Sequence, residues 1–304
     1  MSLSLDTAVT TLQQHACALP AAAWLAALAG LGGSYGLRAA RLHAEWHGRT
    51  GASGADCLRL FLLHNAAVAW VPLRGGEAGY PLWLRRRWGV PLQESLPSLL
   101  WLRLQDAAVL AGLSAGTLAL ITIGLAAPWA LLLAGAALLA LIAPLERWLE
   151  RWSRTPAATT GTGSHWARGR AALLARRGGR RAWHCCLGNW VIKLTVIAAL
   201  LASLGLPESA AALRGAIAGE WAGVLPVQPP GGLGSYEAAV WLGGAGASRV
   251  AAGPVLGAAL VVHAVTLALA GLGGLAAALL PWPATPRMTP MHTMDTMDTT
   301  SGPT

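Results

Sequence analysis

Long apolar runs alternate with short basic or polar stretches along this chain. A helix that crosses a membrane needs about 20 mostly apolar residues, and most of these runs approach or exceed that length. The pattern therefore predicts five membrane-spanning helices, at about 20–37, 96–124, 128–145, 183–204 and 250–280.

Two further apolar segments, 58–84 and 209–247, are broken near their centres. The first contains Pro-Leu-Arg-Gly-Gly-Glu at 72–77, and the second contains a Pro- and Gly-rich stretch at 226–234. Proline ends the helix before it and glycine permits a tight backbone path, so each segment is predicted to form two half-helices joined by a turn. The residues expected to shape these turns are Pro72, Gly75, Gly76, Pro230, Gly231, Gly232 and Gly234.

Composition and charge support a membrane protein. Of the 304 residues, 55% are hydrophobic and 12% are charged, whereas soluble domains carry about 25% charged residues. A soluble enzyme is therefore excluded. The net charge of +9 comes from Arg residues that cluster between apolar runs, a distribution typical of cytoplasmic loops and not of a nucleic-acid-binding surface. No nucleic-acid partner is expected.

The Arg clusters also orient the chain. They follow the first predicted span (Arg38, Arg41, Arg49 and Arg59), follow segment 58–84, and occur nine times between 147 and 181. With these regions in the cytoplasm, segment 58–84 enters and leaves from the cytoplasmic side, whereas 209–247 does so from the opposite side. The fold predicted is an all-α polytopic membrane protein whose two oppositely inserted re-entrant hairpins form an inverted repeat, as in transporters with a midplane site.

These features divide the chain into regions and place its basic loops and its C-terminus in the cytoplasm. The expected regions are an N-terminal segment (1–19), a transmembrane domain (20–282) containing a basic cytoplasmic loop (146–182), and a disordered polar tail (283–304).

Ionisable side chains inside membrane helices cost at least about 2.5 kcal/mol each on insertion scales and so indicate candidate functional residues. Arg103 and Asp106 lie three apart on one helical face and are expected to pair, with either a functional or a purely structural role. Glu237 opens the half-helix after the second Gly run, where a carboxylate either acts in transport or simply caps the helix. Lys193 is expected to extend towards the membrane surface and His263 to pack between helices.

The sequence contains none of the common hydrolase, metalloprotease or nucleotide-binding motifs. Its four Cys residues show no metal-type spacing. We therefore expect no enzymatic activity, no cofactor and no metal ion.

Two motif regions resemble the lysylphosphatidylglycerol synthase transmembrane-region family. One runs from Asn65 to Asp106 and includes Pro-Leu-Arg-Gly-Gly-Glu and Leu-Arg-Leu-Gln-Asp; the other is Pro-Gly-Gly-Leu-Gly-Ser-Tyr-Glu, ending at Glu237. The resemblance covers about residues 30–280, with Leu102 where the family usually has Glu, and the family's first helix is expected to be missing. It implies lipid translocation without aminoacyl transfer in a bacterial cytoplasmic (inner) membrane. It also implies that Arg74, Glu77, Arg103, Asp106 and Glu237 are the functional residues.

The expected function is thus translocation of a polar-headed, polyprenyl- or hopanoid-type lipid between leaflets. Arg74 and Arg103 are expected to bind a phosphate, while Glu77, Asp106 and Glu237 balance these cations or carry protons. The expected partners are membrane lipids with anionic headgroups. Two alternatives stay open: a proton-coupled transporter of a small solute, and a non-transporting membrane partner of lipid-modifying enzymes.

Overall fold

The computed structural model describes residues 19–154, 179–224, 229–245 and 252–280. Their regular structure is entirely helical, with no strand among them. Nearly all of the predicted N-terminal segment (1–19), the whole of the predicted tail (283–304) and the middle of the predicted basic loop lie outside these residues.

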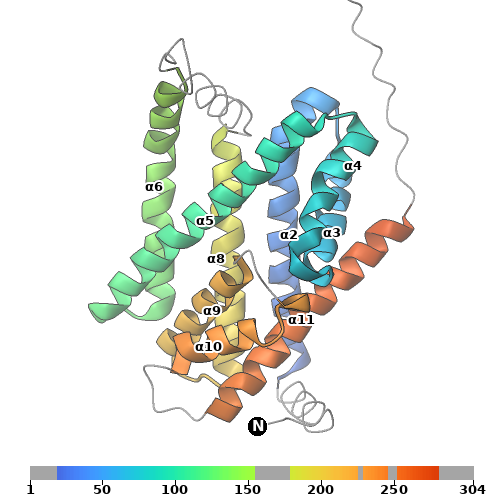
Figure 1. The fold of residues 1–304 in the computed structure, drawn as a ribbon. Coiled ribbons are helices and arrows are strands. Elements are labelled where there is room, and N and C mark those ends of the chain that lie inside the picture. Colours follow the sequence, from blue (N-terminus) through green and yellow to red (C-terminus); the bar gives the residue numbers. More distant parts are fainter. Residues whose placement is uncertain (1–18, 155–178, 225–228, 246–251, 281–304) are drawn as a thin grey trace, which may run out of the picture.

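Five long helices occur among the described residues, namely α2 (Ala21–Thr50), α5 (Leu92–Thr122), α6 (Ala127–Arg154), α8 (Gly179–Leu204) and α11 (Ala252–Leu279). Helix α2 runs most of the height of the molecule, whereas α11 rises obliquely from the lower end to about mid-height (Figure 1). Four of them, α5, α6, α8 and α11, are long and apolar enough to cross a membrane, and they match four predicted spans. The fifth predicted span, 20–37, lies in α2. That helix has the length but is less apolar, because it contains Gly-Gly-Ser-Tyr-Gly at 32–36.

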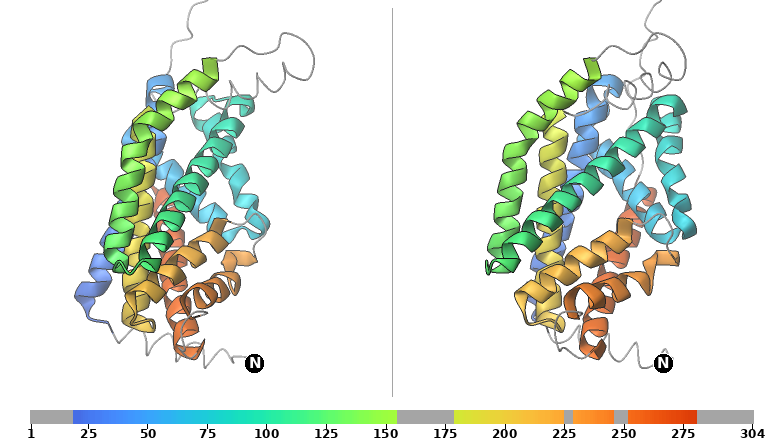
Figure 2. Two further views of the ribbon diagram at one scale, coloured as in Figure 1. Left: turned by 90° about the vertical axis from the view of Figure 1, so that its left-hand side faces the viewer. Right: turned by 60° about the vertical axis from the view of Figure 1, so that its left-hand side comes forward.

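The first broken segment forms a helical hairpin of α3 (Gly54–Trp70), the short 3-10 helix η1 (Pro72–Ala78) and α4 (Gly79–Trp88). Ser53 and Asp56 form a capping box at the start of α3, and Pro72 follows its end. At 17 residues, α3 is shorter than a typical membrane span. The hairpin descends from the upper end of the molecule, turns near mid-height and returns (Figures 1 and 2).

The second broken segment forms the opposite hairpin, from α9 (Ser209–Val224) through η2 (Pro230–Gly232) to α10 (Ser235–Ala245). It rises from the lower end and returns there (Figures 1 and 2). The three glycines of the turn all have positive φ angles, between 65° and 86°, which side chains with a Cβ rarely adopt: Gly231, Gly232 and Gly234. Both segments therefore break where the Pro and Gly pattern predicted.

The first hairpin is anchored to its neighbours by buried aromatic side chains. Trp46 of α2 donates a hydrogen bond to the Tyr80 hydroxyl of α4 (2.9 Å), which also lies 2.9 Å from the Ser98 hydroxyl of α5. Trp46 and Tyr80 belong to an apolar cluster between α2, α3 and α4, while a larger cluster surrounds α8. These contacts fix the height at which η1 lies.

The predicted basic loop, 146–182, is partly helical. Helix α6 continues to Arg154 and α8 begins at Gly179, and Arg180 pairs with Glu146 at 3.3 Å. The helix ends later than the apolar run, because residues 146–154 are mostly Arg, Leu, Trp and Glu, which are compatible with a helix.

Candidate functional site

The turns of the two hairpins meet, since η1 contacts η2, and residues of the second turn line the first of three adjoining cavities. Two cavities of about 180 Å³ each share a wall formed by α2, α3, α8 and α9, and a smaller one of about 50 Å³ lies towards α4. Four cations and two carboxylates line these cavities, namely Arg38, Arg41, Arg103, Lys193, Asp106 and Glu220.

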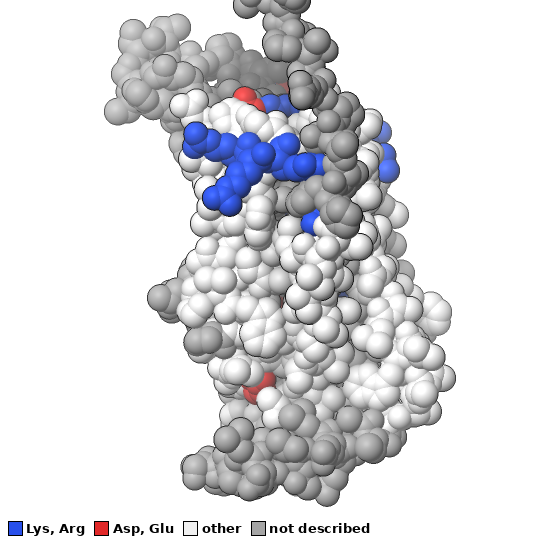
Figure 3. Space-filling model, turned by 90° about the vertical axis from the view of Figure 1, so that its right-hand side faces the viewer, with Lys and Arg blue, Asp and Glu red and all other residues white. Residues whose placement is uncertain are grey.

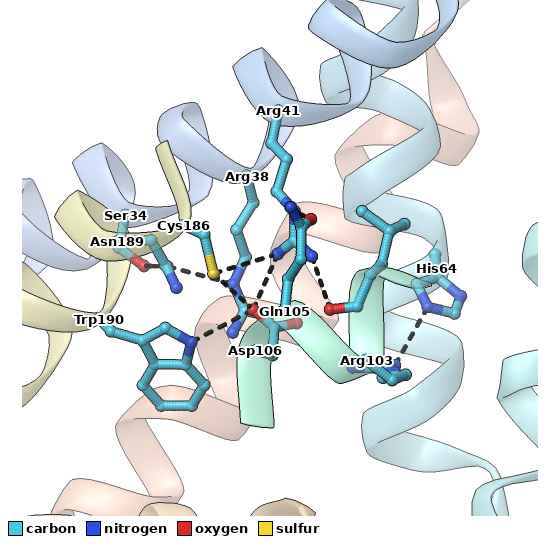
Figure 4. Close-up of polar contacts among 11 residues, drawn as sticks. Ser34, Arg38, Arg41, His64, Arg103, Gln105, Asp106, Cys186, Asn189 and Trp190 are labelled. Atoms are coloured by element: carbon cyan, nitrogen blue, oxygen red, sulfur yellow. Dashed lines mark hydrogen bonds and ion pairs between the residues drawn. The ribbon is translucent and has the colours of Figure 1, made fainter. Parts of the chain in front are cut away.

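Arg38 of α2 lines all three cavities. Its Nε donates a hydrogen bond to Asn189 Oδ1 of α8 (3.1 Å), which also accepts one from the Ser34 hydroxyl (2.8 Å). The Arg38 guanidinium carbon lies 5.9 Å from the Phe61 ring centre and 5.7 Å from that of Trp190. These neighbours hold the guanidinium in place where the cavities adjoin. Figure 4 shows Arg38 beside Asn189 and Trp190 of α8.

Arg41 and Asp106 form a buried ion pair between α2 and α5, with Arg41 4% and Asp106 7% exposed. Arg41 Nη1 donates to Asp106 Oδ1 at 2.8 Å. The same carboxylate oxygen accepts hydrogen bonds from Trp190 Nε1 (3.2 Å) and the Cys186 thiol (3.4 Å). Figure 4 shows these donors converging on Asp106 from α2 and α8. Since its charge is matched by Arg41, Asp106 ties three helices together.

Arg103 pairs with Glu77 of η1 through two contacts, Nη2 to Oε1 at 2.6 Å and Nε to Oε2 at 3.3 Å. His64 Nε2 of α3 lies 3.3 Å from Arg103 Nη2 and 3.6 Å from Glu77 Oε2. Arg103 and Asp106 thus each pair with another helix or turn, and the predicted pair within one helix is not the one formed. The cluster attaches the first turn to α5.

Lys193 of α8 and Glu220 of α9 form an ion pair of 2.5 Å, and both side chains line the two larger cavities. The prediction that Lys193 extends to the membrane surface is wrong, because a carboxylate from the second hairpin lies within reach.

Glu237 holds the second turn in two ways. Its Oε2 accepts a hydrogen bond from the backbone N–H of Gly234 (2.7 Å), which caps α10, and its Oε1 lies 2.7 Å from His263 Nδ1 of α11. His263 also lines the first cavity. The capping role is confirmed, while the prediction for His263 missed its carboxylate partner.

The structure thus brings Glu77 and Arg103 together, places Asp106 beside two cavities and Glu237 in the second hairpin. Arg74 lies in η1, and its side chain is outside the part of the chain that the structure describes. Among the described residues, no group of three or more His, Cys, Asp and Glu side chains is arranged to hold a metal ion.

Sequence reasoning treated Arg38 and Arg41 as loop charges, whereas α2 continues to Thr50 and carries both into the interior. The sequence does contain a pattern that predicts their interior position. Polar residues recur at helical spacing on one face of α2, namely Ser34, Arg38, Arg41 and Glu45. Such a stripe on a long helix indicates a polar partner in the interior.

Comparison with known proteins agrees with this architecture. Residues 3–274 match the family described as lysylphosphatidylglycerol synthase TM region, and the match begins upstream of residue 30, where the sequence motifs placed its start. No curated protein and no solved structure matches the chain. Multiple apolar helices and the family match identify a multi-pass membrane protein. The chain belongs to the lysylphosphatidylglycerol synthase TM region family.

Proposed function

We propose that this protein translocates a lipid with a polar headgroup, of glycerophospholipid, polyprenyl or hopanoid type, between the leaflets of a bacterial cytoplasmic membrane. One observation carries the proposal: a cavity lined by Arg38, Lys193 and Glu220 reaches the second hairpin turn at Gly231 and Gly232, and a second charged cavity adjoins it among long apolar helices. Ionisable groups at such depth are costly and mark substrate pathways.

In this proposal, α3–η1–α4 and α9–η2–α10 are re-entrant hairpins that enter the membrane from opposite faces. The short lengths of α4 and α10, 10 and 11 residues, support this assignment. Non-helical backbone at membrane depth is tolerated where it lines a cavity, which is where η2 lies. The headgroup passes through the cavities while the tails stay in the surrounding lipid.

The cytoplasmic side is the end where basic side chains gather. Figure 3 shows Lys and Arg near the upper end of one face above a mostly uncharged surface. Arg85, Arg86 and Arg87 close α4 at this end, and Arg147, Arg151 and Arg154 lie in the last turns of α6. By the positive-inside rule this end faces the cytoplasm.

A second candidate function is proton-coupled transport of a small solute through the same cavities. The observation that favours it is the buried contact between His263 and Glu237, 2.7 Å apart beside the first cavity. A His–carboxylate pair in a membrane protein is a common proton-carrying group.

The test is dithionite quenching of fluorescent lipids in proteoliposomes that contain the full chain. We expect protein-dependent quenching for wild type and its loss in Glu237→Gln and Arg103→Gln. The first variant removes the α10 charge that caps the second turn, and the second removes the α5 charge that pairs with Glu77 of the first turn. Glu208→Gln is the matched control, because Glu208 is exposed at the start of α9.

Absence of protein-dependent quenching with phospholipid, polyprenyl phosphate and hopanoid probes contradicts the proposal, as do variants with the wild-type rate. Solute-dependent proton uptake in the same vesicles then identifies the solute transporter. If neither activity is found, a non-transporting partner of lipid-modifying enzymes remains.

A further inference from the structure

Among the described residues, three of the four Arg and Lys side chains that line the cavities each form an ion pair with a carboxylate, and Arg38 does not. Arg41 pairs with Asp106 (2.8 Å), Arg103 with Glu77 (2.6 Å) and Lys193 with Glu220 (2.5 Å). Both carboxylate oxygens of Glu237 are engaged by Gly234 and His263. Within the described part of the chain, no carboxylate forms an ion pair with Arg38.

Arg38 is held in one orientation although it has no counterion. Its Nε donates a hydrogen bond to Asn189 Oδ1, and the same oxygen accepts a hydrogen bond from the Ser34 hydroxyl. Aromatic rings of Phe61 and Trp190 lie within 6 Å of its guanidinium carbon. The two terminal nitrogens have no partner among the described side chains. They form the fork that binds two oxygens of one phosphate or carboxylate group.

We infer that Arg38 is the residue that selects the headgroup, by binding one singly charged phosphodiester at the junction of the three cavities. This inference rests on the proposed lipid translocation. The charge sets the ligand class, because one cation without an ion-pair partner matches one negative charge. A phosphate monoester carries about −1.5 to −2 at neutral pH and leaves excess charge in a half-buried site, and a neutral headgroup leaves Arg38 without a counterion.

Binding is measured apart from transport, by the thermal unfolding of the purified full chain in detergent. The titrants are dioctanoyl phosphatidylglycerol, dioctanoyl phosphatidic acid, dioctanoylglycerol and water-soluble glycerophosphoglycerol. We expect the phosphodiester lipid to stabilise wild type at the lowest concentration, with Arg38→Gln weakening that binding about 10- to 100-fold.

Two further variants separate binding from folding. Asn189→Asp places a carboxylate where the Asn189 amide oxygen accepts a hydrogen bond from Arg38 Nε. The carboxylate neutralises the charge of Arg38 while the side chain stays in place. This variant is therefore also expected to bind phosphatidylglycerol more weakly than wild type. Arg38→Lys, which keeps the charge without the fork, is expected to bind with intermediate strength. Arg86→Gln removes an exposed cation from α4 and is expected to bind like wild type.

The inference is overturned if Arg38→Gln and Asn189→Asp bind phosphatidylglycerol as tightly as wild type. It is also overturned if dioctanoylglycerol or dioctanoyl phosphatidic acid binds more tightly than phosphatidylglycerol. The same holds if glycerophosphoglycerol alone binds as tightly as the lipid, which identifies a soluble anion as the ligand.

Two outcomes separate this inference from the proposed function. Lipid binding that depends on Arg38 but occurs without translocation contradicts the proposed function and leaves the inference standing. Translocation of phosphatidylglycerol with unchanged binding by both variants contradicts the inference alone.

Discussion

Buried charge in this protein is matched by partners from other helices. Arg41, at 4% exposure, meets Asp106, and the pair is completed by Gln105, which accepts from Arg41 Nε (3.1 Å), and by Trp190, which donates to Asp106. Breaking a buried pair by removing one partner is strongly destabilising, because the other charge remains in a low-dielectric environment.

At the scale of single residues, we predict that Asp106→Asn lowers the free energy of unfolding by about 3 kcal/mol, because Arg41 loses its counterion. Thermal unfolding in detergent measures the change. The control is Glu94→Gln, which breaks the more exposed pair between Arg49 and Glu94 and is expected to cost about 0–1 kcal/mol. Equal unfolding temperatures for the two variants contradict a structural role for the Asp106 pair.

At the scale of elements, the first turn packs directly on the helix that precedes it. A Cβ atom on Gly76 would lie 2.1 Å from the carbonyl carbon and oxygen of Ala67 in α3, a distance that requires the backbone to move. The predicted role of Gly76 in shaping this turn thus has a physical basis, which is the close approach of two backbones. Gly75 has more room, since its nearest neighbour is the Val71 side chain at 3.1 Å.

We therefore predict that Gly76→Ala separates η1 from α3 and destabilises the protein by about 1–3 kcal/mol, as overpacking generally does. Because Glu77 moves with the turn, the contact with Arg103 weakens too, and the lipid translocation rate falls. Unfolding temperature and dithionite quenching measure the two effects.

Gly36→Ala is the matched control for this element. Gly36 is exposed in α2 and a Cβ there meets nothing within 4 Å, so this variant is expected to be neutral or to stabilise the helix by up to about 1 kcal/mol. A Gly76→Ala protein as stable and active as Gly36→Ala shows that η1 does not need the close contact.

At the scale of the whole molecule, the two hairpins begin at opposite ends. Arg86 lies near the end of α4, at the upper end in Figure 1, and Glu208 immediately precedes α9 at the lower end; both are exposed. If the long helices cross the membrane, these two residues lie on opposite sides of it.

We predict that a membrane-impermeant maleimide labels Glu208→Cys in intact cells and labels Arg86→Cys after permeabilisation only. Cys17 is replaced by Ser in every variant, because it lies outside the described residues. Cys57, Cys185 and Cys186 are buried, so the parent protein without an added Cys serves as the unlabelled control. Labelling of both positions from one side contradicts the opposed hairpins, and a reversed pattern contradicts the orientation alone.

Much of the fold follows from local properties of the chain. Four predicted spans match long apolar helices, and both breaks fall where Pro and Gly interrupt apolar runs.

The residues of the candidate site were harder to predict than the fold. Glu77, Arg103, Asp106 and Glu237 stood out because charge is rare in apolar runs, but Arg38 and Arg41 did not, since they follow an apolar run in the way that loop charges do.

The sequence by itself therefore determined the membrane class, the apolar helices, the two turns and the family, because these depend on hydropathy, helix-breaking residues and motifs within short stretches. The tertiary structure alone decided which charges pair. Arg41 and Asp106 are 65 residues apart, and Ser34 and Asn189 are 155 apart, so helix packing selects such partners. That packing cancels the other cations around the cavities and leaves Arg38 without a counterion, which makes it the residue expected to bind the substrate.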